Sequence, residues 1–580
     1  MMLAISVNFL VPISPAKLTL TNLTDEYQEP EIEWNKFKTE MNKAAEEELG
    51  YRTTKKKNWI TKETEELQAE IRKCKEVTLN SDKDRNEKTA ELTELRKQLK
   101  KRLASDKNNM LEDLANEMED AFKRGDSKKL FANVNKLSGS TITKIISAEP
   151  VRDGNGDIIT EKKRIMERWK QHFDELLNRE DPNNTEETFN EIEQSEKRYE
   201  TDDESVDDDI SIEEVERAVK QMRKNKAPGV CNITAEMLQN TGVHTVKWLH
   251  RVITSVWNTE QTPLDWRKAV IIPIHKKGDR KVCNNTRGIS LLSVPGKVFT
   301  RVMLNRVNDT VDEALRENQC GFRKGRGCSD QIFLLRQLIE KKLEFNEDLV
   351  MCFIDFAQAY DSIWRKGAWK LMRNYGINAK ILRLIENLYS TVLACIRIDG
   401  EETEWFKIKT GFRQGCILSP MLFNMVLDYI LRRLENVNGM GTSSKPGSIE
   451  DAEYADDTCL IAECLSRIIE LTEALANESG KFGLKINTSK TKIMPITKKE
   501  DHWPAVTHNG KEIEIVPNFV YLGSALEAEG GSDLEIKRRI ALSGSTFNRL
   551  HTKIFKRHDV GIRTKQNSQH LCSTNSNIWM

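Results

Sequence analysis

The chain has 580 residues, which is too long for one compact core and predicts roughly two to four domains. Its 90 basic and 90 acidic residues cancel, which argues against a uniformly basic nucleic-acid-binding protein, and no apolar run reaches the roughly 18 residues of a membrane span. Basic residues nevertheless collect locally, at 96–102, 272–281 and 536–557, and a local basic groove is what a phosphate backbone requires.

Eleven cysteines are spread along the chain, and no two of them form a Cys-x-x-Cys pair. The odd number and the spacing favour neither a zinc ribbon nor a disulfide framework, and they are typical of a reducing compartment. Residues 1–13 are apolar, but no basic residue precedes them, which argues against a signal peptide. We expect residues 1–31 to be disordered.

Residues 32–149 are predicted to be helical. Trp34 and Phe37 begin an apolar stripe, and leucines recur later at steps of three and four, as on one helix face. These are Leu92, Leu95, Leu99 and Leu103. We interpret the basic residues between them as the solvated face of a bundle or coiled coil; a helix that contacts RNA or DNA is the alternative.

Residues 150–209 are acidic and poor in apolar side chains, and like charges at 202–204 and 207–209 would repel each other in a packed setting. We therefore expect an acidic linker that is flexible and separates two domains. Ser211, followed three residues later by Glu214, is typical of a helix start.

From residue 210 to about 545, helical segments alternate with short apolar runs that read as strands. Such runs lie at 269–274, 349–354 and 459–462. The mixture predicts an α+β fold. Residues 559–580 are polar and without periodicity, which predicts a disordered tail.

Two acidic positions lie where a strand ends or turns. The apolar run 350–354 leads directly into Asp355, and Asp456-Asp457 precede another apolar run, as in a hairpin with its acids at the turn. Joining nucleotides takes two Mg²⁺ ions about 3.5–4 Å apart, and Mg²⁺ is held by carboxylates together with substrate phosphates. Taken alone, each acidic position is more typical of an ordinary solvated turn than of a metal site.

Further motifs accompany the two acidic positions in a fixed order. They occupy 226–229, 273–279, 287–291, 319–323, 355–361, 411–420, 454–457, 483–487 and 519–524. Over roughly residues 210–545, this series resembles the reverse transcriptases of non-LTR (LINE-type) retrotransposons. The helical stretch 32–137 is similar to the segment between endonuclease and polymerase in such elements.

The resemblance implies a right-hand polymerase with fingers and palm over residues 210–515, the palm being built on an antiparallel sheet. A primer-grip hairpin and the start of the thumb would occupy 516–558. The carboxylates of Asp355, Asp456 and Asp457 would hold two Mg²⁺ ions, with Mn²⁺ as a possible substitute. No small-molecule cofactor is implied.

The resemblance also implies roles for other side chains. Arg287 would grip the incoming triphosphate, and Tyr360 would exclude a ribose 2′-hydroxyl. The full nucleotide-binding set is Arg287, Lys276, Phe356, Tyr360, Gln414 and Gly415. The general acid would be Lys490 or Lys492, and the primer grip would be Tyr521, Leu522 and Gly523.

The chain departs from the family pattern in four places. Val230 to Ile233 replace the usual turn after 226–229, and Thr286 replaces the aromatic before Arg287. Residues 1–31 are too short for the endonuclease domain that the family carries. The likeness fades after Thr564, so we expect a truncated thumb.

The predicted function is RNA-directed DNA polymerisation, in which dNTPs are added to a DNA primer on an RNA template. Cytoplasm or nucleus is expected from the family, no membrane is involved, and the oligomeric state stays open. One alternative is a catalytically weak or inactive retroelement-derived protein that binds RNA. Another is a helical interaction protein that acts through residues 32–137.

Overall fold

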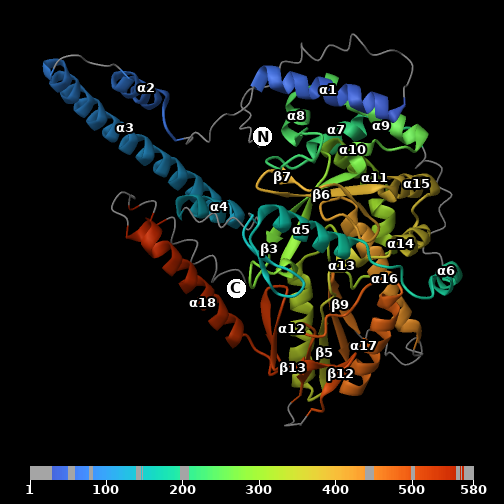
Figure 1. The fold of residues 1–580 in the computed structure, drawn as a ribbon. Helices are drawn as coiled ribbons and strands as arrows, with labels where there is room; N and C mark the ends of the chain where they lie inside the picture. Colours follow the sequence, from blue (N-terminus) through green and yellow to red (C-terminus); the bar gives the residue numbers. More distant parts are fainter. Residues whose placement is uncertain are drawn as a thin grey trace. The chain divides into compact units, whose positions relative to one another are not determined.

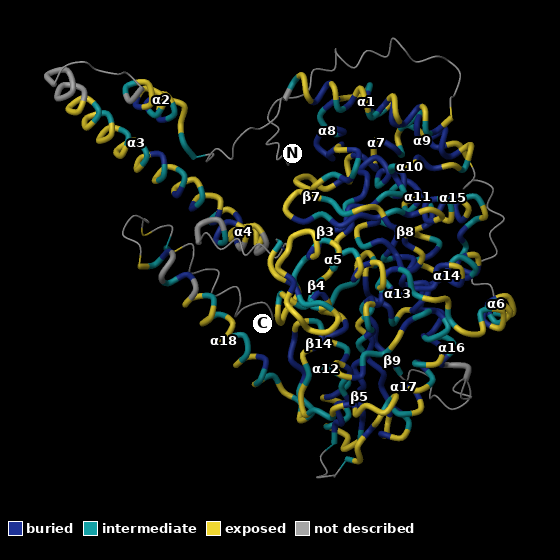
Figure 2. The backbone as a smooth tube through the Cα atoms, viewed as in Figure 1, coloured by how far each residue is buried: buried dark blue, intermediate teal, exposed yellow. Residues whose placement is uncertain are grey.

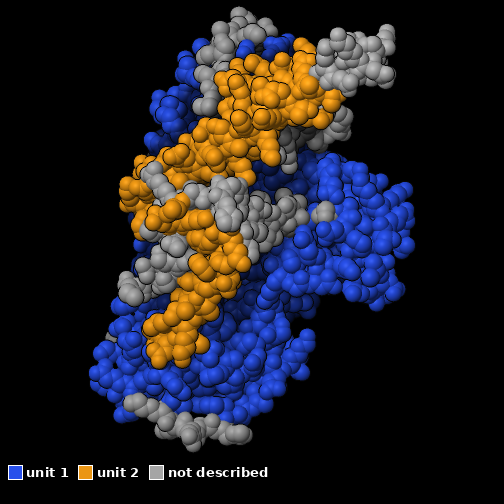
Figure 3. All heavy atoms as spheres, turned by 90° about the vertical axis from the view of Figure 1, so that its left-hand side faces the viewer, with its two compact units in different colours: residues 1–51, 144–531 blue, residues 52–143, 532–580 orange. Residues whose placement is uncertain are grey.

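The computed structural model divides into two compact units, residues 1–51 with 144–531 and residues 52–143 with 532–580 (Figures 1 and 3). The structure describes residues 29–49, 59–76, 82–138, 146, 148–195, 208–437, 450–497, 503–556, 562 and 565–566. Of the ends predicted to be disordered, 1–31 and 559–580, residues 1–28, 559–561, 563–564 and 567–580 lie outside the described residues, whereas Pro30 and Glu31 belong to a helix. None of the helices within these ranges is long and apolar enough to cross a membrane.

The second unit is helical. Its elements are α2 (Lys62–Glu76), α3 (Asp82–Lys123), α4 (Ser127–Ser138), α18 (Asp533–Leu550) and the π-helical turn η7 (His551–Phe555). A small core joins Met118 of α3 and Val134 of α4 to Leu550 and Ile554. The helix predicted over residues 32–149 is confirmed here at α2, α3 and α4. The leucines of α3 are half-buried, while the basic residues between them are exposed.

The first unit begins with α1 (Pro30–Leu49), which packs on α9 (Val243–Thr259). Trp34, Phe37 and Met41 recur at helical spacing and are completely buried. Lys38 Nζ lies 2.6 Å from the Asp265 carboxylate, which also accepts a hydrogen bond from Trp34 Nε1 at 3.2 Å. The first predicted helix therefore belongs to the unit that carries the sheets.

Residues 150–195, which were predicted to belong to a flexible linker, form regular secondary structure instead. It forms a short ladder, β1 (Val151–Arg152) with β2 (Ile158–Ile159), and then α5 (Lys162–Leu177) and α6 (Thr185–Gln194). Ile165, Trp169 and Phe173 recur every four residues on α5, which gives this otherwise charged helix one apolar face to bury. Residues 196–207 lie outside the described residues.

The chain then forms further helices and a first mixed sheet. The helices are α7 (Ile212–Lys220), α8 (Ala235–Asn240), α10 (Leu264–Arg267), α11 (Val294–Ala314), α13 (Ala359–Ser362), α14 (Arg365–Met372) and α15 (Ala379–Ser390), with 3₁₀ turns at Cys283–Asn285 and Arg373–Tyr375. The strand order is β4 (Thr286–Leu291), β3 (Lys268–His275), β6 (Val392–Ile398) and β7 (Glu401–Glu402), and β8 (Phe406–Ile408) also pairs with β6. The predicted start of α7 is confirmed, because Ser211 and Glu214 form reciprocal capping bonds.

The second sheet is six-stranded. Its order is β12 (Val506–His508), β13 (Lys511–Ile515), β11 (Lys492–Ile496), β5 (Leu349–Ile354), β10 (Asp457–Ala462) and β9 (Asp451–Tyr454). All neighbours are antiparallel except β11 and β13. The α+β prediction is confirmed.

Strand β5 lies at the centre of this sheet and is buried over its whole length (Figure 2). Val350, Cys352 and Ile354 join the main core, on the side of α17 (Leu465–Gly480) and α16 (Ser419–Val437). The alternate residues face α12 (Cys328–Glu344) and the hairpin β14 (Asn518–Tyr521) with β15 (Ser524–Glu527). Because both faces of β5 are covered, the chain becomes accessible to solvent only beyond the two ends of this strand.

Candidate active site

The acidic residues lie together at one end of the six-stranded sheet. Ile354 pairs with Thr458 in the β5–β10 ladder, so Asp355 follows β5 at the level where β10 begins. Tyr454 pairs with Asp457, so Ala455 and Asp456 form a two-residue turn, with Ala455 in the left-handed region at φ 59°. The sheet register thus brings Asp355 to the Asp456-Asp457 turn, about a hundred residues away in sequence.

Burial and neighbouring negative charges raise the pKa of two of these carboxyls. Burial raises the pKa of Asp456, and the charge of Asp355 adds to this, while Arg287 and Lys276 oppose it. Desolvation of the Asp457 carboxyl, with Asp456 and Asp355 beside it, raises its pKa to about 6. Like charges that raise the pKa of a neighbouring carboxyl favour a cation beside them.

Several cations face this acidic end. Lys490 Nζ lies 3.0 Å from Asp355 Oδ2. Burial lowers the pKa of Lys276, and the charges of Arg287 and Lys490 lower it further. Arg287 is exposed and, within the part of the chain that the structure describes, makes no side-chain hydrogen bond or ion pair. Lys492 instead pairs with Glu514 at 2.8 Å.

Tyr360 lies five residues after Asp355, in the short helix α13. Its ring stacks on Phe423 with centroids 4.4 Å apart and planes 22° apart. Its hydroxyl is buried and has no hydrogen-bond partner among the described residues. Burial raises the pKa of Tyr360, and the Asp456 charge adds to this, so the hydroxyl lies near the acidic turn.

Gln414 and Gly415 lie against β4. Gln414 Nε2 donates to both Asp361 oxygens, at 2.9 and 2.7 Å, and its carbonyl accepts from Ser290 N at 2.9 Å. Gly415 has φ 125°, and a Cβ there would lie 2.6 Å from Ser290 O. Only glycine therefore lets this loop pass so close to β4.

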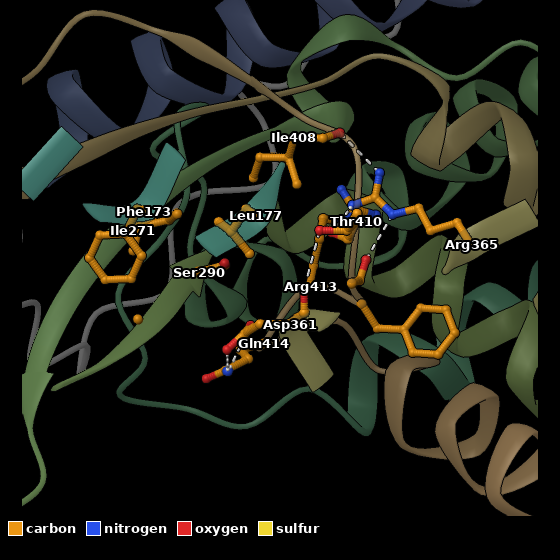
Figure 4. Close-up of a pocket in the computed structure, with 13 residues that line it drawn as sticks. Phe173, Leu177, Ile271, Ser290, Asp361, Arg365, Ile408, Thr410, Arg413 and Gln414 are labelled. Carbon is orange, nitrogen blue, oxygen red and sulfur yellow. Dashed lines mark hydrogen bonds between the residues drawn. The ribbon is translucent and has the colours of Figure 1, made fainter. Parts of the chain in front are cut away.

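A cavity lies behind Gln414, between α5 and the loop before Gln414 (Figure 4). Asp361 and Gln414 line it, and so does Arg365, whose guanidinium donates to three backbone carbonyls of the loop. Burial raises the pKa of Asp361 to about 6, with the Gln414 bond and the charges of Arg179, Arg287 and Lys276 opposing.

The other predicted site residues are Phe356, which directly follows Asp355, and the predicted primer grip. The Phe356 side chain is buried in the main core, and its backbone pairs with Ile486. Leu522 and Gly523 form the β14–β15 turn. Tyr521 is buried, and its hydroxyl donates to Asp457 O at 3.1 Å, so this hairpin lies against the strand that carries the acids.

Two residues of this site were not singled out from the sequence. Asp361 ends the motif that begins with Asp355, yet its bond to Gln414 joins positions 53 residues apart. Gln319 donates to Glu453 and accepts from Ala455 N in the acidic turn. Their only sequence signal is membership of two motifs, 355–361 and 319–323.

Comparison with known proteins agrees with this geometry. Residues 274–526 match the family described as reverse transcriptase (RNA-dependent DNA polymerase). A protein named RNA-directed DNA polymerase from mobile element jockey, from Drosophila funebris, is 26% identical over 357 residues, 60% of this chain and 38% of its own length.

Two further relatives extend the comparison. An uncharacterized 149 kDa protein of transposon TX1, from Xenopus laevis, is 24% identical over 337 residues, 55% of this chain and 26% of the relative. A Pol polyprotein of retrotransposable element R2, from Popillia japonica, is 26% identical over 284 residues, 49% of this chain and 39% of the relative. The chain thus matches well under half the length of each of these relatives. Residues 274–526 are a reverse transcriptase domain related to those of non-LTR retrotransposons.

Proposed function

We propose that this chain is an RNA-directed DNA polymerase of a LINE-type retroelement. It would add dNTPs to a primer 3′-hydroxyl on an RNA template. The observation that carries the proposal is the register of β5 with β10, which brings Asp355 to the Asp456-Asp457 turn beneath a group of cations. Residues 210–515 would be the fingers and palm, and 516–558 the primer grip and the start of the thumb.

The acids suit a pair of divalent ions. Among the described residues, no group of three or more His, Cys, Asp or Glu could hold a metal by itself. Mg²⁺ is commonly held by one or two carboxylates plus substrate phosphates, and Asp355 with Asp456 supplies such a pair. When bound, the ions would activate the primer hydroxyl and stabilise the leaving pyrophosphate.

The cations suit a triphosphate. The exposed guanidinium of Arg287 offers a fork of donors that matches phosphate oxygens, and Lys276 would add a second positive charge. Because burial and its cationic neighbours already lower the pKa of Lys276, an incoming anion would stabilise its charged form. Gln414 and Gly415 would line the nucleotide from below, and Phe356 would contribute through its backbone.

The contacts favour Lys490 over Lys492 as the general acid. The Lys490 ammonium already touches Asp355, where it would lie beside the reacting phosphates. The Lys492 ammonium is tied to Glu514 and to the carbonyl of Ser489. Lys492 would therefore stabilise the β11–β13 edge.

An RNA-binding protein without turnover is the second candidate. The same basic groups would hold a phosphate backbone, and primer extension separates the two functions. The assay would use a labelled DNA primer on an RNA template with Mg²⁺, beside Asp456→Asn. We expect extension by the unmodified chain, none by Asp456→Asn, and no change in Asp399→Asn, a matched substitution in the β6–β7 turn. A folded chain that extends nothing with either Mg²⁺ or Mn²⁺ would leave only RNA binding.

A further inference from the structure

The loop 318–321 runs along β9 and continues the six-stranded sheet beyond its edge. Cys320 N donates to Glu453 O at 2.9 Å, and Glu453 N donates to Asn318 O at 3.2 Å. Gln319 and Glu453 form an isolated parallel bridge. The loop therefore lies beside the last residues of β9 before the acidic turn.

The Gln319 side chain reaches from this loop into the turn. It is completely buried. Its Oε1 accepts from Ala455 N at 2.9 Å and from Gly321 N at 2.7 Å, and its Nε2 donates to Glu453 Oε2 at 3.0 Å. Because one end of the amide accepts twice and the other donates to a carboxylate, a flipped amide would break every bond.

A buried ion-pair network holds the Glu453 carboxylate in place. Its other oxygen bonds Arg316, whose guanidinium also bonds Asp451 at 2.9 Å. Asp428 accepts from Arg316 N at 2.8 Å and from Tyr375 at 2.6 Å. The partner that orients Gln319 is therefore held from several elements.

The turn itself needs such a support. Ala455 is in the left-handed region at φ 59°, which is unfavourable for a residue with a side chain. A Cβ on Gly321 would lie 2.2 Å from Ala455 N, so loop and turn are in direct backbone contact. Without the Gln319 bond, the Ala455 N–H would be buried and unpaired, which would destabilise the turn.

We propose that Gln319 is a positioning residue for Asp456. By holding the Ala455 N–H, it keeps the strained turn in the conformation that places Asp456 at the same end of the sheet as Asp355. This inference rests on the proposed function, because it concerns the carboxylates that would hold the metal ions. It assigns to the loop a role in metal binding as well as in folding.

The test compares Gln319→Leu with Gln331→Leu in the full chain. Gln331 is equally buried and holds the same loop from α12, with Nε2 donating to Asn318 O at 2.8 Å and to Cys320 Sγ at 3.0 Å, but it has no bond to the turn. Both substitutions remove an amide that supports the loop. Only Gln319→Leu frees the Ala455 N–H.

Two readouts are measured. Mn²⁺ affinity, followed through the free-ion signal in electron paramagnetic resonance, needs no turnover. For Gln319→Leu we expect it to weaken at least about fivefold, and kcat for primer extension to fall about 10²-fold with the dNTP KM nearly unchanged, as for a misplacement near 1 Å. For Gln331→Leu we expect both quantities to stay near those of the unmodified chain, even if its thermal midpoint falls.

The outcomes separate the two proposals. If the unmodified chain does not extend a primer, the proposed function fails, and the Mn²⁺ titration still decides the role of Gln319. If Gln319→Leu binds Mn²⁺ as the unmodified chain does, or if Gln331→Leu loses as much affinity, Gln319 only stabilises the loop and the inference is wrong.

Discussion

The ionised carboxylate of Asp361 is predicted to lower the free energy of unfolding. It accepts two hydrogen bonds from Gln414, yet burial raises its pKa to about 6 from an ordinary 3.8. The folded chain therefore binds this proton more tightly than the unfolded chain does. The contribution of this carboxyl to the free energy of unfolding is fully present below about pH 3.8. It is lost as pH rises towards 6 and is absent at higher pH.

The magnitude follows from that difference. From 3.8 to about 6 is about 2.2 pH units, and at 1.36 kcal/mol for each the ionised carboxyl costs about 3 kcal/mol above pH 7. Asp361→Asn removes the charge and keeps one acceptor for Gln414, so roughly 1 kcal/mol of hydrogen bonding is lost. The variant is expected to be about 2 kcal/mol more stable at pH 8 and no more stable at pH 4.5.

Urea unfolding at the two pH values measures this, and Asp428→Asn is the matched control. Asp428 is completely buried and accepts from Arg432 Nε at 2.8 Å as well as from Arg316. Removing its charge leaves the buried Arg316 and the half-buried Arg432 with one anion fewer and should cost about 3 kcal/mol at pH 8. Asp361 does not carry the raised pKa if Asp361→Asn lowers stability at pH 8, or if its effect is the same at both pH values.

Three further predictions concern the nucleotide site. Gly415→Ala should raise the dNTP KM about tenfold or more, because the new Cβ meets Ser290 O at 2.6 Å; a KM within twofold would contradict this contact. Tyr360→Ala should raise ribonucleotide incorporation relative to deoxynucleotide incorporation, whereas Tyr360→Phe, which removes an unpartnered hydroxyl, should leave it unchanged; equal discrimination by all three chains would remove the gate role. Lys490→Gln should lower kcat about 10²-fold, as loss of a general acid does, while Lys492→Gln should mainly lower stability, and the reverse order would exchange their roles.

Much of the fold was predictable because it depends on local patterns. The apolar run before Asp355 became β5 without a shift of boundary, and Ser211 with Glu214 began a helix as their spacing indicates. Residues 150–195 were misjudged because the charged positions of α5 outnumber its apolar ones. An apolar side chain at every fourth position, with Trp169 in the middle, is enough to bury one face of a helix when the rest of the unit supplies an apolar surface for it to pack on.

The site was predictable where a motif is contiguous and not where it depends on register. Asp355 and the Asp456-Asp457 turn could be named from sequence, but only the pairing of Ile354 with Thr458 brings them together. The link from Gln319 to Ala455 joins residues 136 positions apart through one side chain. No periodicity or spacing encodes such a contact, because it depends on how two loops meet in space.

The most direct test of the central claim is a double-substitution cycle on the two acids. Single-nucleotide extension of a primer on an RNA template would be measured for the unmodified chain, Asp355→Asn, Asp456→Asn and the double variant. If both carboxylates hold the same metal ions, each single substitution should lower the rate by at least about 10³-fold, and the double variant should be little worse than either. Effects of the two substitutions that multiply, or extension that survives Asp355→Asn, would contradict a shared metal centre at this end of the sheet.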